Sequence, residues 1–210
     1  MLHLDVVKSD IKMKKINLRI LAIDPGLTNT GWVLMECNPT DETLTILKLG
    51  EFHPGPTADR AENREPVNEF SKRTISLKLL REKMNAILLD VQPDYVVAEG
   101  IFFNPLRPQA HEALAMWHCV VRLACMDMLK KKLEVVPTKI AKKILTGSGG
   151  NGKLTVQQSI VMCKEISFKN EALKRTMSEH CADAIAVGYA FMKSNREQML
   201  LQLGIVKHSK

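Results

Sequence analysis

Two acidic residues stand at the ends of short apolar runs, where a buried strand would bring a carboxylate to the edge of a sheet. They are Asp24 and Glu99, and a further pair, His180 and Asp183, is spaced so that both project from one face of a helix. Glutamate is depleted from strands and is rarely buried without a partner, so its position favours a functional role. Asp183 lies in an apolar helical stretch, where a carboxylate needs a cation.

Hard oxygen ligands of this kind suit Mg²⁺, with Mn²⁺ as a substitute. We expect Asp24, Glu99 and Asp183 to bind two such ions, with His180 as a further ligand or a proton-transfer group. Two ions about 3.5–4 Å apart would activate a water, stabilise the leaving oxygen and so hydrolyse a phosphodiester. Taken singly, each residue also has an ordinary use, since Asp24 precedes a Pro-Gly turn and Asp183 could complement a helix N-terminus.

Hydrophobic periodicity predicts the elements that carry these residues. Strands are expected near 18–23, 31–35, 43–50, 94–99 and 133–137, and helices over 71–90, 109–132, 138–145, 154–166 and 178–191. Short links make the first three strands an antiparallel meander, and helical crossovers make the last two parallel to the first. The prediction is an α/β fold with a mixed five-stranded sheet flanked by helices, in which Asp24 and Glu99 share one edge.

The chain length suits one domain with a full core. We place this domain at 18–193, between a polar leader at 1–17 and a C-terminal tail at 194–210. The segment 53–68 is rich in proline and charge and is predicted to be a long irregular loop, either a lid or a surface excursion. The broad apolar face of helix 109–132 indicates core packing or a buried subunit contact.

The positive charge is concentrated in one segment. The chain has a formal net charge of +7, and residues 130–175 hold eleven basic and three acidic residues, which accounts for the whole excess. Binding to a phosphate backbone requires such a field, so nucleic acid is favoured over a membrane as the partner. Lys139, Lys142 and Lys143 in this segment are candidate DNA-binding residues.

Three more residues are candidates for contact with DNA. Lys153 follows a glycine-rich turn and begins a helix, where a cation opposes the helix dipole; it either contacts phosphate or is a solvated surface residue. This turn is not a Walker A loop, because Leu154 follows the lysine. Phe102 and Phe103 are adjacent, so one could stack on a base or wedge into a branch point, or both could pack within the protein.

Cysteine content and hydropathy indicate a location. The five cysteines form no C-x-x-C pair, and no apolar run has the length of a membrane span. The N-terminal residues lack the apolar core of a signal peptide. We expect an intracellular, cytoplasmic protein in a reducing environment, or one in the host cytoplasm if the protein is viral.

The ordered set of motifs resembles one known family. The motifs are Ile23-Asp24-Pro25-Gly26 with Thr30-Gly31, Gln92-Pro93-Asp94-Tyr95 leading to Glu99, Phe102, the glycine-rich turn with Lys153, and His180-x-x-Asp183-Ala184. Over about residues 20–191 this set is similar to the RuvC-type Holliday junction resolvases. The resemblance implies an RNase H-like fold, a homodimer built on the long helix, and Mg²⁺-dependent paired nicking of four-way DNA junctions.

The resemblance also implies roles for single residues. Asp24, Glu99 and Asp183 match the metal-binding acids of the family, and His180 falls where its members have an acid or a histidine. Lys153 matches the catalytic-loop lysine, and Phe102 the aromatic residue that engages the junction.

Departures from the family pattern indicate a divergent, phage- or virus-like member, and leave broader cutting of branched DNA open. They are the long loop at 53–68, Gly100 after the glutamate, and the leader. A second resemblance is to the phosphate hairpin of actin and the sugar kinases, through Asp24-x-Gly26. Those proteins clasp a nucleotide between two such domains, for which this chain is too short. A third hypothesis, a non-catalytic junction-binding protein, leaves the acids at the strand ends unexplained.

Overall fold

The computed structural model describes residues 17–26, 28–54, 72–101, 105–106, 108–147 and 153–206, excepting the side chains of residues 153–155. In chain order the elements are β1 (Leu18–Asp24), β2 (Thr30–Asn38), β3 (Thr43–Phe52), α1 (Lys72–Val91), β4 (Tyr95–Glu99), α2 (Pro108–Leu129), β5 (Leu133–Val136), α3 (Thr138–Thr146), α4 (Lys153–Met162), β6 (Ile166–Phe168), α5 (Glu171–Arg175) and α6 (Glu179–Gln202). The predicted α/β architecture is confirmed, with most element ends within about two residues of the predicted ones.

The strands form one mixed sheet in the order β5-β4-β1-β2-β3-β6. The antiparallel meander β1-β2-β3 and the parallel pairs β1/β4 and β4/β5 agree with the sequence-based prediction. Central β1 is buried on both faces, which is why its sequence is almost continuously apolar. The sheet therefore carries its first and fourth strands side by side, each ending on an acid.

The strand number was predicted wrongly, because a sixth strand, β6, pairs in parallel with the edge strand β3. The helix predicted over 154–166 ends at Met162 instead, and α5 was not predicted. A strand of three residues shows no alternation that a sequence pattern could reveal. It forms because β3 offers unpaired backbone groups: the N–H of Leu44 donates to the carbonyl of Glu165 at 2.8 Å, and that of Lys169 to Ile46 at 2.9 Å.

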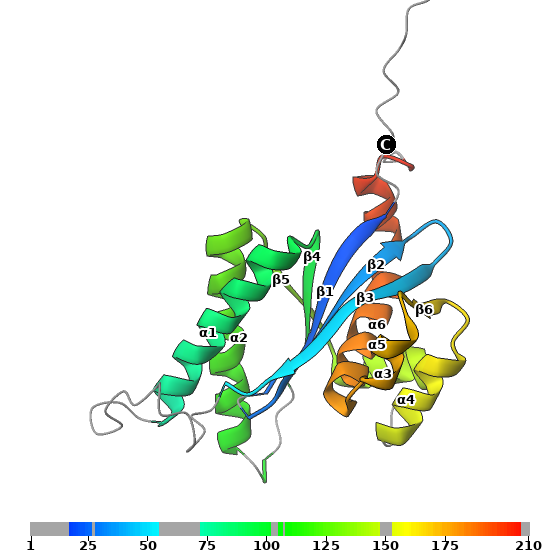
Figure 1. Cartoon of the computed structure of the whole chain (residues 1–210). Coiled ribbons are helices and arrows are strands. Elements are labelled where there is room, and N and C mark those ends of the chain that lie inside the picture. Colours follow the sequence, from blue (N-terminus) through cyan, green and yellow to red (C-terminus); the bar gives the residue numbers. More distant parts are fainter. Residues whose placement is uncertain are drawn as a thin grey trace, which may run out of the picture.

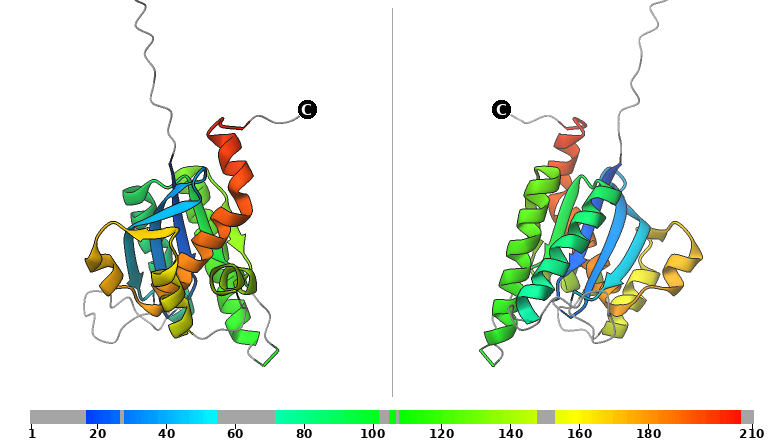
Figure 2. Two further views of the ribbon diagram at one scale, coloured as in Figure 1. Left: turned by 90° about the vertical axis from the view of Figure 1, so that its right-hand side faces the viewer. Right: turned by 60° about the vertical axis from the view of Figure 1, so that its left-hand side comes forward.

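Helices cover both faces of the sheet (Figure 1). Alternate side chains of β1 divide between two cores, so that Ile20 and Ala22 pack with α6 while Leu21 and Ile23 pack with α1 and α2. The helices α3 and α4 join α6 on its face, and the views in Figure 2 show the same separation of the two helical layers. The sheet is thus held between α1 and α2 on one side and α6 with its neighbours on the other.

Helix α6 is the central element of its layer. Its first turn is capped by Ser178, whose side chain accepts a hydrogen bond from the N–H of Cys181 at 3.2 Å. The helix continues to Gln202, into the stretch predicted as the C-terminal tail, because Met199 and the following Leu203 are buried in the same core. Of the helices that the structure describes, none is long and apolar enough to cross a membrane.

Replacement of Gly31 should destabilise the fold at the contact between β2 and α6. A Cβ atom at this position would lie 2.5 Å from the backbone carbon and oxygen of His180, so Gly31→Ala must push the start of α6 from the sheet. We expect a loss of about 1–3 kcal/mol in the free energy of unfolding, measured by urea denaturation. Gly147→Ala is the control: it meets no atom within 4 Å and bears only the strain of a positive φ, about 1 kcal/mol. Equal losses in the two variants would contradict the steric explanation.

Candidate active site

Asp24 and Glu99 lie side by side at one edge of the sheet. In the parallel pair β1/β4, Ile23 is in register with Ala98, so the next residue of each strand is one of the two acids. Neighbouring strands are about 4.8 Å apart, which brings both carboxylates within reach of one ligand. Asp24 is 8% exposed, and Glu99 is half-buried.

The first turns of α6 bring His180 and Asp183 to the same edge. Nδ1 of His180 lies 2.7 Å from Oδ2 of Asp24, and Asp183 acts on the charges of Asp24 and Glu99. Gly31 makes this approach possible, since the space of a β-carbon is filled by the backbone of His180. Four of the residues predicted to bind metal or act in catalysis therefore converge on one place.

Lys142 of α3 faces this group of acids. Its Nζ is 3.9 Å from Oδ1 of Asp183, and its side chain is only 22% exposed. It was predicted as a DNA-binding residue on charge alone, whereas the structure places it beside the carboxylates. No sequence signal separates it from its neighbours Lys139 and Lys143, which are exposed on the same helix.

Burial and the charges of neighbouring carboxylates raise the pKa values of the two strand-end acids. Burial raises the pKa of Asp24 to about 6, against the hydrogen bond from His180, with a further upward contribution from the charge of Asp183. Burial likewise raises the pKa of Glu99 to about 7, helped by the charge of Asp24 and opposed by a hydrogen bond from Thr138. The site therefore holds negative charge only at a free-energy cost, which a bound cation would remove.

The donor set fits a hard divalent cation. It consists of oxygen atoms from three acids, of which Asp24 and Glu99 have raised pKa values, together with one imidazole. Within the part of the chain that the structure describes, no three His, Cys, Asp or Glu side chains are arranged as a ready metal site. Asp24 is directed toward His180 and Asp183 toward Lys142. The metal set of Asp24, Glu99, His180 and Asp183 thus stays a prediction.

The structure adds contacts that the sequence did not indicate. Asn29 lies with its Nδ2 3.4 Å from Nε2 of His180, and His53 at the end of β3 bonds to the side chain of Asn29. On the other side, Nε2 of His118 lies 3.0 Å from the carbonyl oxygen of Glu99. None of these residues belongs to a motif, and only the tertiary arrangement brings them to the site.

Some predicted residues cannot be placed. Phe102 and Phe103 lie outside the described residues, as do residues 1–16 of the predicted leader and 55–68 of the predicted loop. Lys153 begins α4, but its side chain is likewise outside the described part. Their proposed contacts with DNA stay predictions.

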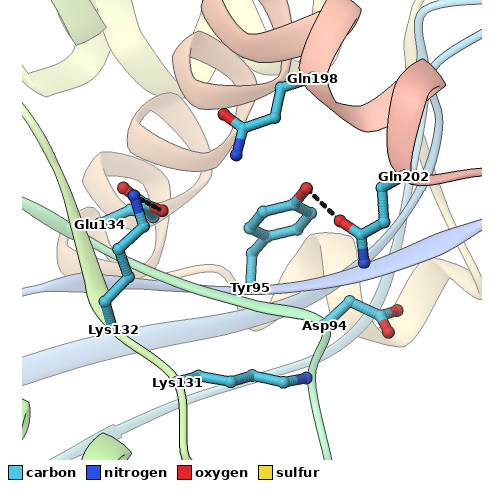
Figure 3. Close-up of a pocket in the computed structure, with 7 residues that line it drawn as sticks. All are labelled: Asp94, Tyr95, Lys131, Lys132, Glu134, Gln198 and Gln202. Carbon is cyan, nitrogen blue, oxygen red and sulfur yellow. Dashed lines mark hydrogen bonds and ion pairs between the residues drawn. The ribbon is translucent and has the colours of Figure 1, made fainter. Parts of the chain in front are cut away.

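A separate hollow of about 260 Å³ lies at the opposite end of β4 (Figure 3). It is lined by Asp94, Tyr95, Lys131, Lys132, Glu134, Gln198 and Gln202. Its polar groups pair locally: Lys132 binds Glu134 at 2.8 Å, Lys131 donates to the carbonyl of Pro93 at 2.6 Å, and the hydroxyl of Tyr95 donates to Gln202. This hollow lacks Asp24 and Glu99, so we place the active site at the C-terminal ends of β1 and β4, where these two acids lie.

Comparison with known proteins decides the family. The family model described as crossover junction endodeoxyribonuclease RuvC matches residues 20–191. The chain belongs to the RuvC family. Membership in this family of nucleases implies a divalent metal cofactor. The crossover junction endodeoxyribonuclease RuvC of Wolbachia sp. subsp. Brugia malayi (strain TRS) is 27% identical over 179 residues, which cover 84% of this chain and 96% of that protein. The protein of Wolbachia pipientis wMel is 28% identical over 180 residues, 85% of this chain and 97% of its own.

Solved structures of a RuvC protein and of a second Holliday junction resolvase have the same fold. Thermus thermophilus RuvC in complex with Holliday junction substrate superposes with a TM-score of 0.61 at 17% identity, covering 86% of this chain and 96% of that chain. The yeast mitochondrial Holliday junction resolvase superposes with a TM-score of 0.62 at 12% identity, covering 90% and 84%. The RNase H-like architecture expected from the resemblance is therefore confirmed.

The pKa shifts predict that the metal-free protein loses stability as the pH rises. A carboxyl whose folded pKa is raised contributes stability that is complete below about pH 4 and is lost as the pH passes about 6 for Asp24 and 7 for Glu99. We expect Asp24→Asn and Glu99→Gln to have a free energy of unfolding higher than that of the wild type at pH 8 in chelator, each by on the order of 2 kcal/mol, and therefore to unfold at a higher temperature.

The measurement is thermal unfolding from pH 4 to 8, followed by circular dichroism. Asp90→Asn serves as the control, because this exposed carboxylate pairs only with Lys48 at the surface among the contacts seen. A pH dependence that is identical in the wild type and both site variants would show that the two carboxyls are not destabilising.

Proposed function

We propose that this protein resolves four-way DNA junctions by metal-dependent hydrolysis of phosphodiesters, acting as a homodimer that makes paired nicks. The observation that carries the proposal is the convergence of Asp24, Glu99 and Asp183 from two strand ends and one helix. Membership in the RuvC family supports it, as does the Holliday junction substrate of the related Thermus thermophilus protein.

Asp24, Glu99 and Asp183 would hold the metal, with His180 as a fourth group, and Mg²⁺ suits these oxygen donors best, with Mn²⁺ as a substitute. Two bound ions would supply an activated water and charge stabilisation at the leaving oxygen. His180 is oriented by its Nδ1 contact with Asp24, which leaves Nε2, near Asn29, as the atom able to accept a proton or bind metal. Lys142 offsets part of the negative charge when the site is without other cations.

The DNA would lie across the exposed side of α3. Lys139 and Lys143 are exposed on this helix, one turn apart, while Lys142 faces the acids. Lys153, at the start of α4, would contact the scissile phosphate, and Phe102 or Phe103 would stack on a base at the branch point. Phosphate contacts of this kind position a duplex without reading its sequence.

A second copy of the chain would pack on α2. Leu123 is 40% and Met126 53% exposed, and they lie on the side of α2 that faces away from the sheet. Two copies related by a two-fold axis would present two active sites to one symmetric junction. All five cysteines are free thiols, three of them buried, which supports the reducing intracellular location.

The decisive assay compares labelled four-way, three-way and duplex DNA, each incubated with and without Mg²⁺. We expect the wild type to cut four-way junctions only with metal, because the acids alone repel the phosphates. Asp24→Asn should bind the junction as well as the wild type and cut it at least 10²-fold more slowly. Nicking retained by this variant would overturn the assignment of the site.

The same assay separates the alternatives. Equal cutting of three-way DNA would identify a broader branched-DNA nuclease. Junction binding by the wild type without cutting in Mg²⁺ or Mn²⁺ would identify a non-catalytic binding protein. ATP turnover without DNA would revive a nucleotide-binding function, and a monomer on the junction would contradict paired cleavage.

Alanine substitutions of the α3 lysines should distinguish residues that bind the junction from a residue that affects the rate of cleavage. Lys139→Ala and Lys143→Ala each remove an exposed cation, so we expect the slope of log affinity against log salt to fall by about 1, with little change in the rate at saturating junction. Lys142→Ala should lower that saturated rate as well, because its ammonium lies beside Asp183. The measurements are junction affinity over a salt series and single-turnover cleavage. A pure binding defect in Lys142→Ala would show that Lys142 belongs with its exposed neighbours.

A further inference from the structure

Two neighbouring residues of α2 make hydrogen bonds close to Asp24 and Glu99, one to a side chain of β2 and one to the backbone of β4. Trp117 is fully buried, and its Nε1 donates to Oγ1 of Thr30 at 3.3 Å. His118 is 4% exposed, and its Nε2 lies 3.0 Å from the carbonyl oxygen of Glu99. These contacts come from the face of the sheet opposite to α6.

The contact of Trp117 extends to the turn after Asp24. The hydroxyl of Thr30 donates to the carbonyl oxygen of Gly26 at 2.7 Å while it accepts the hydrogen bond from the indole. Thr30 is fully buried, so water does not compete for these bonds. The turn that follows Asp24 is therefore tied to α2 through one buried side chain.

The contact of His118 has a defined direction. A carbonyl oxygen only accepts hydrogen bonds, so Nε2 of His118 carries the proton that is donated to Glu99. Nδ1 of the same ring is buried and has no hydrogen-bond partner in the part of the chain that the structure describes. A buried polar atom without a hydrogen-bond partner lowers the stability of the folded protein by about 1–3 kcal/mol. An apolar residue would pack here at lower cost, which makes the bond to Glu99 the reason for a histidine.

We propose that Trp117 and His118 are positioning residues that fix the separation of the two strand-end carboxylates, and with it the affinity of the site for metal. The two rings pack edge to face with centroids 5.2 Å apart, so neither shifts without the other. Their bonds reach the turn after Asp24 and the backbone of Glu99, and both originate from one turn of one helix. The inference rests on the proposed function, because it takes these acids as metal ligands.

The test is Mn²⁺ binding to the protein alone, measured by electron paramagnetic resonance, in two isosteric variants. In His118→Gln the side-chain amide places an N–H where Nε2 was, whereas in His118→Asn it reaches only the position of Nδ1 and leaves the carbonyl of Glu99 without its donor. We expect the dissociation constant for Mn²⁺ to stay within about 3-fold of the wild type for His118→Gln and to rise about 10–100-fold for His118→Asn. Trp117→Phe loses the indole N–H together with part of a buried ring, so it should weaken Mn²⁺ binding in the same direction and also lower the unfolding temperature.

A matched control separates positioning from loss of stability. Val121→Ala removes a fully buried side chain of the same helix that makes no polar contact, so it should lower the unfolding temperature and leave Mn²⁺ affinity unchanged. Folding of every variant is checked by circular dichroism. Equal Mn²⁺ affinity in His118→Asn and His118→Gln, or an equal loss in Val121→Ala, would overturn the inference.

The outcome for the inference is distinct from the outcome for the proposed function. A wild type that binds Mn²⁺ and shows the predicted order of variants, yet leaves junctions uncut, would support the positioning role and contradict the nuclease. If the wild type cuts junctions and His118→Asn binds Mn²⁺ as tightly as the wild type, the nuclease function is supported and the positioning role is contradicted.

Discussion

The constraint on which the rest of the site depends is the placement of two poorly hydrated carboxyl groups at the ends of adjacent parallel strands, where burial and neighbouring charges raise both pKa values. Two unit charges separated by a strand spacing of about 4.8 Å repel by about 3.5 kcal/mol at the effective dielectric of a protein interior. Asp24 and Glu99 are at neighbouring strand ends because β1 and β4 pair in register up to Ile23 and Ala98. The neighbouring groups on the helices offset this repulsion: the imidazole of His180, the ammonium of Lys142 and the hydrogen bond from Thr138.

Such an arrangement persists only if the strands cannot separate, and the two cores provide this restraint. β1 contributes side chains to both cores, and the residues it buries on either face are fully inaccessible. α6 brings its histidine and aspartate across one face, while α2 donates hydrogen bonds from the other face, to the carbonyl of Glu99 and to the side chain of Thr30. The acids are therefore held by packing on two sides, and the free energy of the apolar cores is what keeps like charges close.

The sequence predicts the strand ends well and the surroundings of the acids poorly, for a physical reason. An apolar run that ends in an acid is a local pattern, and a helical crossover returns the chain to the same end of the sheet and so makes the strands parallel, which places Asp24 beside Glu99. By contrast, β6 has three residues and exists only because β3 has a free edge. The approach of His118 to Glu99 depends on the angle at which α2 crosses the sheet, which no periodicity encodes.

The basic segment 130–175 also shows that a local pattern predicts the charge but not where each lysine lies. Lys131 and Lys132 sit at the far end of the sheet, where a carbonyl and Glu134 bind them, so part of the excess charge lies away from the acids. On α3, Thr138 and Lys142 are four residues apart and face the carboxylates, while Lys139 and Lys143, also four apart, are exposed. Because a helix is rigid over two turns, helical geometry sets where the outer pair of lysines would hold a phosphate relative to the acids that face the inner pair. A basic helix so placed can draw DNA toward a site whose own charge repels it.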